Sequence, residues 1–315
     1  MTDSHPPHHR TGFVTLVGQP NVGKSTLLNR LLGQKIAITS NRPQTTRNRI
    51  PGVFTRDDAQ IVFVDTPGLH TARRALNSFM VDVAREAMWE TDAVALLVEA
   101  GIGPDGQVGV ADVVRGLLDD LAARKIPVFL VLNKIDRIEK PQLLPIIDAW
   151  QHAHPFAAIV PLSALKGDGI GVLVDALVQV LPEGPPLYPA DALTDLPERF
   201  IAAEMIREKA FRLLGEELPY SIAVTIEDWR DRSSVGRIHI GAVIHVERDS
   251  QKGIVIGKGG QMIKDIGTRA RQDLERMLGT GVDLQLFVRV ERGWTRSVDQ
   301  LRKLGYSGND KGDLS

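Results

Sequence analysis

A loop with the sequence GQPNVGKS, at residues 18–25, lies between a short apolar run and a segment of helical character, and it constrains the fold more than any other feature. The eight residues match the pattern GxxxxGK[ST]. Glycines in this pattern let the backbone curl, so that several N–H groups point inward at phosphate oxygens, and the positive end of the following helix points the same way. The sequence therefore predicts a strand, a phosphate-binding loop and a helix, in that order.

The first 180 residues alternate apolar runs of strand length with segments of helical periodicity. Nearly continuous apolar strands that are separated by helices predict an α/β domain, with a mostly parallel sheet and helices on both faces. Ligands of such sheets bind at the carboxyl ends of the strands. The predicted strands are residues 12–18, 60–65, 93–99, 126–132 and 157–162, and the predicted helices are residues 24–32, 73–89, 108–124, 142–152 and 170–180.

The pattern changes at residues 181–197, which hold five prolines and no periodicity, and which predict a linker or strap between two domains. The order of helices and strands after it predicts a separate α+β domain. Its predicted helices are residues 199–214, 258–278 and 295–304, and its predicted strands are residues 219–228, 237–248 and 282–292. The predicted division is a disordered tail at residues 1–10, an α/β domain at 11–180, the linker at 181–197, an α+β domain at 198–304 and a tail at 305–315.

Composition excludes several classes of protein. The 315 residues include no cysteine, which excludes disulfides, thiolate metal sites and cysteine nucleophiles. Because 38 Lys plus Arg stand against 39 Asp plus Glu, any binding to nucleic acid or membrane must use a local patch. No apolar run approaches the roughly 18 residues of a membrane-spanning helix, and the first ten residues lack the apolar core of a signal peptide. We therefore expect a cytoplasmic protein.

Two residues of the phosphate loop and one motif downstream predict a magnesium nucleotide. Lys24 is expected to reach the β- and γ-phosphates, and the Ser25 hydroxyl is expected to hold Mg²⁺. The sequence DTPG at residues 65–68 ends a predicted strand. Asp65 can hold the Mg²⁺ shell from there, and the N–H of Gly68 can meet a γ-phosphate because no side chain blocks the approach.

The sequence NKID at residues 133–136 follows another predicted strand and predicts the base. Guanine presents two donors side by side, and the Asp136 carboxylate can accept both, whereas adenine would leave a buried carboxylate unpaired. Asn133 is expected to tie this loop to the phosphate loop, and the stem of Lys134 to cover one face of the base. The sequence SALK at residues 163–166 is expected to place backbone N–H groups against the guanine O6.

These four motifs, each at the end of a predicted strand, resemble the G1, G3, G4 and G5 elements of translation-factor-class GTPases. The stretch PQTTRNR at residues 43–49 is similar to their G2 switch, whose threonine closes on Mg²⁺ only when the γ-phosphate is present. Its position favours Thr46, with Thr45 as the alternative. Leu69 stands where Ras-like enzymes have a water-orienting glutamine. GTPases with an apolar residue there and a loop asparagine such as Asn21 resemble potassium-dependent members of the class, so the resemblance implies K⁺ besides GTP or GDP and Mg²⁺.

A second glycine motif, GIVIGKGG at residues 253–260, precedes a predicted helix of the second domain. Its last part, IGKGG, resembles the GxxG loop of a KH domain, where single-stranded RNA backbone lies against main-chain amides. Six Lys or Arg residues against three Asp or Glu residues give residues 252–276 a charge of +3, in a chain of net charge −1. The order of helices and strands is similar to the prokaryotic, type II KH fold.

A GTPase domain followed directly by a KH domain resembles the Era family of bacterial ribosome-assembly GTPases, over roughly residues 11–304. The resemblance implies a slow, K⁺-stimulated and monomeric GTPase that binds the 3′ end of 16S ribosomal RNA (rRNA) during maturation of the 30S subunit and contacts the cell membrane peripherally. Gln19 stands where many relatives are expected to have arginine. Two alternatives stay open, namely a P-loop ATPase or kinase, against which NKID argues, and an RNA-binding protein with a structural nucleotide, which the missing glutamine allows.

The sequence thus predicts three sets of site residues. The predicted catalytic residues are Lys24, Asn21, Thr46 and Gly68. The predicted nucleotide-binding residues are Gly18, Asn21, Val22, Gly23, Lys24, Ser25, Thr26, Thr45, Thr46, Asp65, Thr66, Pro67, Gly68, Asn133, Lys134, Asp136, Ser163, Ala164 and Leu165, with Ser25, Thr46 and Asp65 as Mg²⁺ ligands. The predicted RNA-binding residues are Ile256, Gly257, Lys258, Gly259, Gly260 and Lys264.

Overall fold

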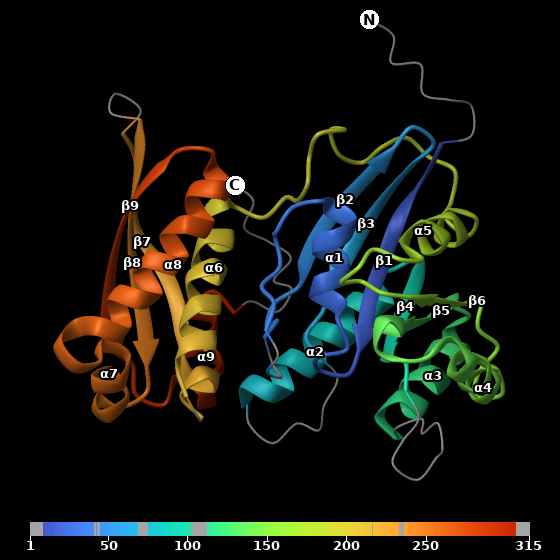
Figure 1. Cartoon of the computed structure of the whole chain (residues 1–315), viewed down its shortest axis with the longest axis horizontal. Coiled ribbons are helices and arrows are strands. Elements are labelled where there is room, and N and C mark those ends of the chain that lie inside the picture. Colours follow the sequence, from blue (N-terminus) through green and yellow to red (C-terminus); the bar gives the residue numbers. More distant parts are fainter. Residues whose placement is uncertain are drawn as a thin grey trace, which may run out of the picture. The chain divides into compact units, whose positions relative to one another are not determined.

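The computed structural model describes residues 9–40, 42, 45–68, 75–101, 112–215, 217–232 and 236–306 of the chain. The chain divides into two compact units, and each unit has its own sheet (Figure 1). The second unit includes two short segments from within the predicted α/β domain. The first unit comprises Met1–Ala37, Thr46–Thr71 and Met80–Asp195, and the second comprises Ile38–Thr45, Ala72–Phe79 and Leu196–Ser315.

The sheet of the first unit has six strands in the order β2-β3-β1-β4-β5-β6. All neighbouring pairs are parallel except β2 and β3, which are antiparallel. The strands are β1 (Arg10–Gly18), β2 (Ile50–Arg56), β3 (Ala59–Asp65), β4 (Ala93–Glu99), β5 (Val128–Asn133) and β6 (Ala158–Leu162). The carboxyl ends of β1, β3, β4, β5 and β6 therefore meet at one edge, as a parallel sheet requires.

Helices cover both faces of this sheet (Figure 1). One face packs against α2, α3 and α4, in a core that includes Leu96, Leu130 and Trp150. The other face carries α1 and α5 (Figure 1). The helices are α1 (Lys24–Leu32), α2 (Ala75–Trp89), α3 (Asp112–Arg124), α4 (Lys140–Gln151) and α5 (Ile170–Val178). The α/β prediction is confirmed, and α1 and β4 have their predicted bounds.

The strand β2 was not predicted, because Pro51 and Gly52 both disfavour a strand interior. At the edge of a sheet a proline is tolerated, since one row of N–H groups needs no partner strand. The predicted linker lies against this edge. The N–H of Val53 donates to the carbonyl of Leu193 at 2.8 Å, and the linker amides of residues 187 and 188 donate to the Gln60 side chain. The linker is therefore a strap that belongs to the first unit as far as residue 195.

The second unit has a three-stranded sheet of order β7-β8-β9, in which β7 and β8 are antiparallel and β8 and β9 are parallel. Among its helices, α6 and α8 pack against each other and against β7 and β9 respectively. This arrangement is the predicted type II KH fold. The elements in chain order are α6 (Glu198–Leu213), β7 (Ala223–Arg232), β8 (Arg237–Val246), α7 (Asp249–Ile256), α8 (Gln261–Leu278), β9 (Gly281–Val290) and α9 (Val298–Lys303).

Several local predictions for the second unit were wrong. The first strand begins at Ala223 rather than at residue 219, because Leu218–Ser221 forms a 3₁₀ turn that contains a proline. The helix α7 was not among the predicted helices, because Gly253, which disfavours a helix interior, lies in its middle. The helix α6, for which a predicted helix at residues 199–214 gave no sign of deep burial, is buried on more than one face. Its buried charged side chains pair with one another or with neighbours.

Some residues of both predicted tails belong to folded structure. Arg10 begins β1, and Tyr306 is buried with its ring stacked on Trp294 at a centroid distance of 5.7 Å. Residues 1–8 and 307–315 lie outside the described part of the chain. No helix among the described residues is both long and apolar enough to cross a membrane.

Candidate nucleotide and RNA sites

The loop between β1 and α1 lies close to the end of β5. Gly23, the residue before α1, has φ +105°, and a Cβ atom built on it would lie 2.2 Å from Nδ2 of Asn133. Only glycine fits this position, because both the backbone angle and the space exclude a side chain. Asn21 also has a positive φ, +64°, a value that asparagine tolerates better than most residues. The loop therefore takes the curled path that the motif predicts.

Lys24 is the buried cation of this loop. Its Nζ atom donates to the carbonyl oxygens of Gly18 at 3.1 Å and Gln19 at 3.0 Å. Burial lowers the pKa of Lys24 to about 8, although the Asp65 carboxylate opposes this shift. An anion beside the ammonium favours its charged form and would raise the pKa again. A bound phosphate would therefore stabilise the charged form of Lys24 in this buried position.

Three oxygen-bearing side chains meet where β3 ends. Ser25 Oγ donates to Asp65 Oδ2 at 2.6 Å, and Thr46 Oγ1 lies 2.9 Å from Ser25 Oγ and 3.1 Å from Asp65 Oδ2. Asp65 is fully buried, and its Oδ1 atom has no hydrogen-bond partner among the residues that the structure describes. Burial raises the pKa of Asp65, against the opposing influence of Lys24 and the two hydroxyls. Two hydroxyls and one buried carboxylate form the hard-oxygen set that Mg²⁺ prefers.

The geometry separates the two threonines of the predicted switch. Thr45 Oγ1 donates to the carbonyl oxygen of Arg42 at 2.9 Å and makes a turn within its own segment. Thr46 Oγ1, by contrast, is directed at Ser25 and Asp65. Thr46 is therefore the better candidate for a metal ligand.

The end of β5 joins two loops through one side chain. Asn133 is buried, and its Nδ2 donates to the carbonyl oxygen of Val22 at 2.6 Å. Its Oδ1 accepts a hydrogen bond from the N–H of Ala164 at 3.0 Å. One amide thus fixes the phosphate loop to the loop after β6, which is the role expected of Asn133.

Asp136 lies exposed beside the loop after β6. The Ser163 hydroxyl donates to Asp136 Oδ1 at 2.5 Å, and this hydrogen bond is the main cause that lowers the pKa of Asp136. Asp136 is therefore ionised at neutral pH, with its other oxygen available as an acceptor. Ser163 itself is buried and also accepts from the N–H of Lys166 at 3.1 Å. The pair presents a fixed carboxylate where a base with two adjacent donors can be recognised.

The contacts of the other predicted residues around the phosphate loop are mainly with the backbone of neighbouring segments. Thr66 is buried, and its hydroxyl donates to the carbonyl oxygen of Leu16 at 2.8 Å. A Cβ atom on Gly68 would lie 2.8 Å from the nitrogen of Pro20, so Gly68 approaches the phosphate loop closely. Leu69 lies outside the described residues. Pro67 is buried, Thr26 is partly buried in α1 and Leu165 is exposed.

The glycine loop of the second unit links α7 to α8. Gly257 has φ +74°, and a Cβ atom on it would lie 2.7 Å from Cβ of Met262, so only glycine lets α8 begin so close to α7. Gly259 and Gly260 also have positive φ angles, +60° and +78°, with open space around them. Backbone in this conformation can approach a ligand without obstruction. The predicted side chains around it are the partly buried Ile256 and the exposed Lys258 and Lys264.

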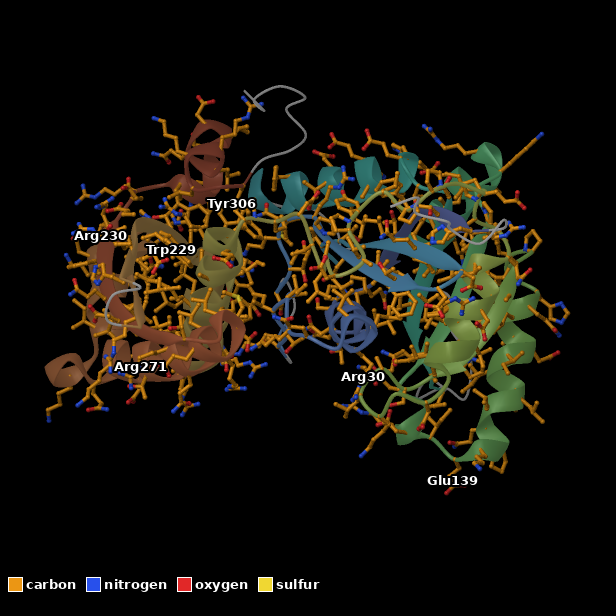
Figure 2. The ribbon with its side chains drawn as sticks, turned by 90° about the horizontal axis from the view of Figure 1, so that it is seen from above. Arg30, Glu139, Trp229, Arg230, Arg271 and Tyr306 are labelled. Carbon is orange, nitrogen blue, oxygen red and sulfur yellow. The ribbon has the colours of Figure 1, made fainter. Side chains whose placement is uncertain are left out.

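The positive charge near this loop is largely unpaired. Two of the six cations predicted for the patch form ion pairs: Arg276 with Asp273 at 2.6 Å, and Arg271, labelled in Figure 2, with Glu275 at 4.0 Å. The other four are exposed and form no ion pair within the described part of the chain: Lys252, Lys258, Lys264 and Arg269.

Comparison with known proteins relates both sites to one family. Residues 13–134 match the family model described as 50S ribosome-binding GTPase, and residues 217–295 match the KH domain model. The chain is 52% identical over 297 residues to the GTPase Era of Geotalea uraniireducens, covering 94% of this chain and 98% of that protein. It is also 52% identical to the GTPase Era of Geobacter metallireducens, with 95% and 98% covered.

The chain belongs to the GTPase Era family. Solved Era structures agree with this. A crystal structure of Era in complex with MgGDPNP and nucleotides 1506–1542 of 16S ribosomal RNA matches with a TM-score of 0.89 and 42% identity, covering 95% of this chain and 100% of that chain. A substituted Aquifex aeolicus Era bound to GDP and tetrafluoroaluminate matches with a TM-score of 0.85 and 41% identity, covering 95% and 99%.

As an Era-family member the chain is a GTPase with an RNA-binding domain, and the ATPase, kinase and non-hydrolysing alternatives are set aside. Guanine nucleotide and Mg²⁺ belong to this activity.

The Era-family nucleotide site holds two residues that the sequence motifs did not predict. Arg30 of α1, labelled in Figure 2, donates to the carbonyl oxygens of Ala164, at 3.3 Å, and of Leu165. Glu99, at the end of β4, pairs with Lys134 at 2.5 Å. Glu99 could have been found, because it ends a predicted strand at the edge where the motifs meet. Nothing in the sequence connects Arg30 with a loop more than a hundred residues away.

Proposed function

We propose that this chain binds the 3′ region of 16S rRNA and acts, as a GTP-hydrolysing factor, in assembly of the 30S subunit. The observation that carries the proposal is the likeness to the Era structure bound to nucleotides 1506–1542 of 16S rRNA, which spans 95% of this chain. The description of the matched GTPase family model, 50S ribosome-binding GTPase, names the other ribosomal subunit, but the model covers only residues 13–134. The Era relation spans both units and is therefore the more specific one.

In this proposal the first unit binds GTP through its own loop geometry. The amides of the phosphate loop and Lys24 hold the phosphates, and Ser25, Thr46 and Asp65 hold Mg²⁺, which neutralises charge on the β- and γ-phosphate oxygens. The N–H of Gly68 meets the γ-phosphate. The mutual hydrogen bonds of the two hydroxyls with Asp65 support this assignment.

The second unit is proposed to hold RNA at the glycine loop. The backbone at Gly259 and Gly260 has open space around it, and four exposed cations of residues 252–276 have no acidic partner in the described part of the chain. Single-stranded RNA can lay its phosphates against such a surface while its bases stay available for recognition. Because the net charge of the chain is −1, this local patch is what attracts RNA.

Crosslinking in cells, followed by sequencing of the bound RNA, tests the RNA target. We expect the crosslinked reads to concentrate at the 3′ end of 16S rRNA and to fall when the glycine loop is altered. A tagged copy that carries Asp148→Asn, an exposed change on α4, serves as the matched control and should give the wild-type pattern. Reads concentrated on 23S rRNA or tRNA would contradict the proposal.

We also propose that K⁺ assists hydrolysis beside Asn21. The side-chain oxygen of an exposed asparagine in the phosphate loop is of the kind that binds hard cations. In this role K⁺ would neutralise charge that develops between the phosphates. Asn21 has φ +64°, a backbone angle that asparagine tolerates, so the residue could also be there for the conformation of the loop. The test must separate this backbone role from the binding of K⁺.

Asn21→Gly separates them, because glycine adopts a positive φ without strain and removes only the amide. In the wild type we expect GTP hydrolysis to be several-fold faster in KCl than in NaCl at equal ionic strength. In the variant the difference should vanish while GDP affinity stays within a factor of about two. Equal wild-type rates in the two salts would exclude a role for K⁺.

Two further expectations from the family resemblance remain proposals, namely that the chain is a monomer and that it associates peripherally with the membrane. Light scattering after size-exclusion chromatography measures the first. Co-sedimentation with anionic vesicles, compared at low and high salt, measures the second.

A further inference from the structure

One segment of the nucleotide-site sequence is held by the second unit. Residues 38–45, of which the structure describes 38–40, 42 and 45, group with that unit and lie along α6. Arg42 donates to the carbonyl oxygens of Phe211, at 3.2 Å, and Leu214, at 2.6 Å, where α6 ends. These bonds satisfy carbonyls that have no partner within the helix.

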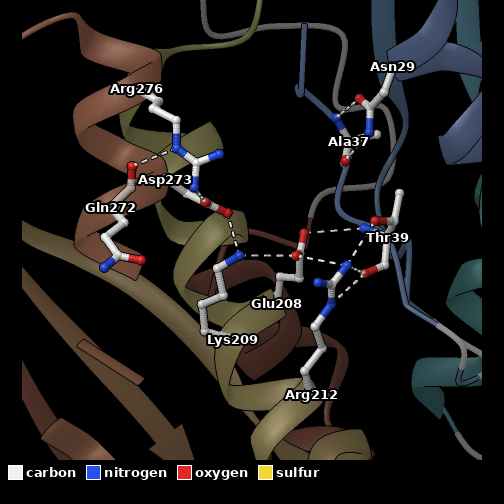
Figure 3. Close-up of polar contacts among 9 residues, drawn as sticks. All are labelled: Asn29, Ala37, Thr39, Glu208, Lys209, Arg212, Gln272, Asp273 and Arg276. Carbon is white, nitrogen blue, oxygen red and sulfur yellow. Dashed lines mark hydrogen bonds and ion pairs between the residues drawn. The ribbon is translucent and has the colours of Figure 1, made fainter. Parts of the chain in front are cut away.

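Thr39 is held from the same helix by two side chains (Figure 3). Its N–H donates to Oε2 of the fully buried Glu208 at 3.3 Å, and its carbonyl oxygen accepts from Arg212 at 2.6 Å. Glu208 also pairs with Lys209, which pairs in turn with Asp273 of α8 (Figure 3). The segment is therefore fixed to α6, and α6 is fixed to the helix that follows the glycine loop.

The segment is also held at its last residue. Arg207 Nη2 donates to the carbonyl oxygen of Thr45 at 2.5 Å. Glu204 orients this guanidinium through Oε1, at 2.7 Å from Nε, and Oε2, at 2.6 Å from Nη2. The side chain of Arg207 is 1% exposed and that of Glu204 is 8% exposed, so the pair is closed to solvent and its geometry is restricted.

The carbonyl of Thr45 belongs to the peptide bond that leads into Thr46. A peptide group is planar, so a fixed carbonyl oxygen also restricts the direction in which Thr46 leaves. Thr46 belongs to the first unit, where its hydroxyl lies at Ser25 and Asp65. Thr45 and Thr46 therefore belong to different units, and Arg207 holds the oxygen of the peptide bond that joins them.

We propose that Arg207, oriented by Glu204, is a positioning residue for GTP hydrolysis, which holds the Thr45 carbonyl so that the Thr46 hydroxyl stays at the Mg²⁺ position. The inference rests on the proposed function, because it takes Thr46 as a metal ligand of the GTP-bound state. It assigns a role in the GTPase reaction to a buried ion pair of the second unit. The competing explanation is that the pair only stabilises the second unit.

The test is a double-mutant cycle on the full chain. Glu204→Leu with Arg207→Met removes both charges together, so that neither is left buried without its partner. Thr46→Ala removes the hydroxyl that is to be positioned, and a third variant combines all three changes. Arg289→Gln is the control within the second unit, because Arg289 of β9 pairs with Glu227 of β7 and has no hydrogen bond to residues 38–45 in the described structure.

Single-turnover GTP hydrolysis is measured against Mg²⁺ concentration, with GDP affinity as the reference. We expect the Glu204–Arg207 double variant to hydrolyse GTP about 10- to 100-fold more slowly and to need more Mg²⁺, since misplaced groups cost rates of this order. GDP affinity should change less than about twofold, because Thr46 serves only the GTP state. Adding the pair of changes to Thr46→Ala should slow hydrolysis little further, because both act through one hydroxyl.

The possible failures have different meanings. A wild-type rate in Thr46→Ala would overturn the metal assignment, and with it the inference. A slow Thr46→Ala together with a wild-type rate in the Glu204–Arg207 variant would overturn the inference alone. If the rate losses of Thr46→Ala and of the Glu204–Arg207 variant multiply in the combined variant, the ion pair does not act through the Thr46 hydroxyl, and the inference is likewise overturned. If the double variant does not give the wild-type circular dichroism spectrum, Arg207→Lys replaces it, because lysine keeps the charge but cannot hold Glu204 and Thr45 together with one planar group.

Discussion

Asp136→Asn is expected to exchange the base preference of the nucleotide site, lowering GTP affinity and raising affinity for xanthosine triphosphate. The carboxylate of Asp136 is held by Ser163 at 2.5 Å, and this hydrogen bond lowers its pKa, so the group is a full acceptor at neutral pH. Asparagine puts a donor where guanine offers donors, whereas xanthine offers a carbonyl at position 2. Because an unmatched polar pair in a binding site costs on the order of 10⁴-fold in discrimination, the change should be large.

Equilibrium binding of fluorescent GTP and xanthosine triphosphate measures this exchange. Asp148→Asn makes the same chemical change on the exposed surface of α4 and serves as the control, which should bind both nucleotides like the wild type. Unchanged GTP affinity in Asp136→Asn would place the base elsewhere.

Replacing Lys258 and Gly259 together by aspartate is expected to lower RNA affinity by about 10-fold or more, because each lost phosphate contact and each new repulsion weakens binding. Both positions are exposed, and Gly259 has φ +60° with nothing within 4 Å, so a side chain has space there. The matched control replaces the same two residues by asparagine, which has nearly the same size and tolerates this φ but carries no charge.

RNA binding is measured by fluorescence anisotropy with a single strand from the 3′ end of 16S rRNA, with GTP, with GDP and without nucleotide. The aspartate variant should bind RNA more weakly than the asparagine variant, and this difference in affinity should become smaller as the salt concentration rises. Wild-type affinity in the aspartate variant would remove the glycine loop from the RNA site. GDP affinity reports whether the first unit is intact.

The parts of the site that the sequence predicts best are those carried by contiguous motifs. The phosphate loop and NKID each follow a predicted strand, and a parallel sheet brings such ends together whatever the side chains between them. Gly23 and Asn133 illustrate this, since they are far apart in sequence and the structure leaves only 2.2 Å between the amide nitrogen of Asn133 and a Cβ built on Gly23. Fold class and nucleotide-site architecture could be predicted for this physical reason.

The parts that could not be predicted depend on pairing between distant, ordinary-looking residues. Pro51 and Gly52 conceal an edge strand, since local propensity favours a loop and the strand forms only because β3 lies beside it. Glu204 and Arg207 look like one more surface pair of an amphipathic helix. Their burial follows from packing around α6, which no periodicity reveals, and so their hold on Thr45 was invisible in the sequence.

The composition of the second unit from three separate pieces of chain also bears on how such proteins can be recombined. Residues 38–45 and 72–79 belong to it as well as everything from Leu196 onward. A crossover that transplanted only the carboxyl-terminal part from one relative to another would bring in Arg207 and Arg212 without the loop that they hold. A recombination that keeps the contacts between residues 38–45 and α6 would have to exchange all three pieces together. The two units are therefore not modules that can be exchanged by a single crossover in the strap.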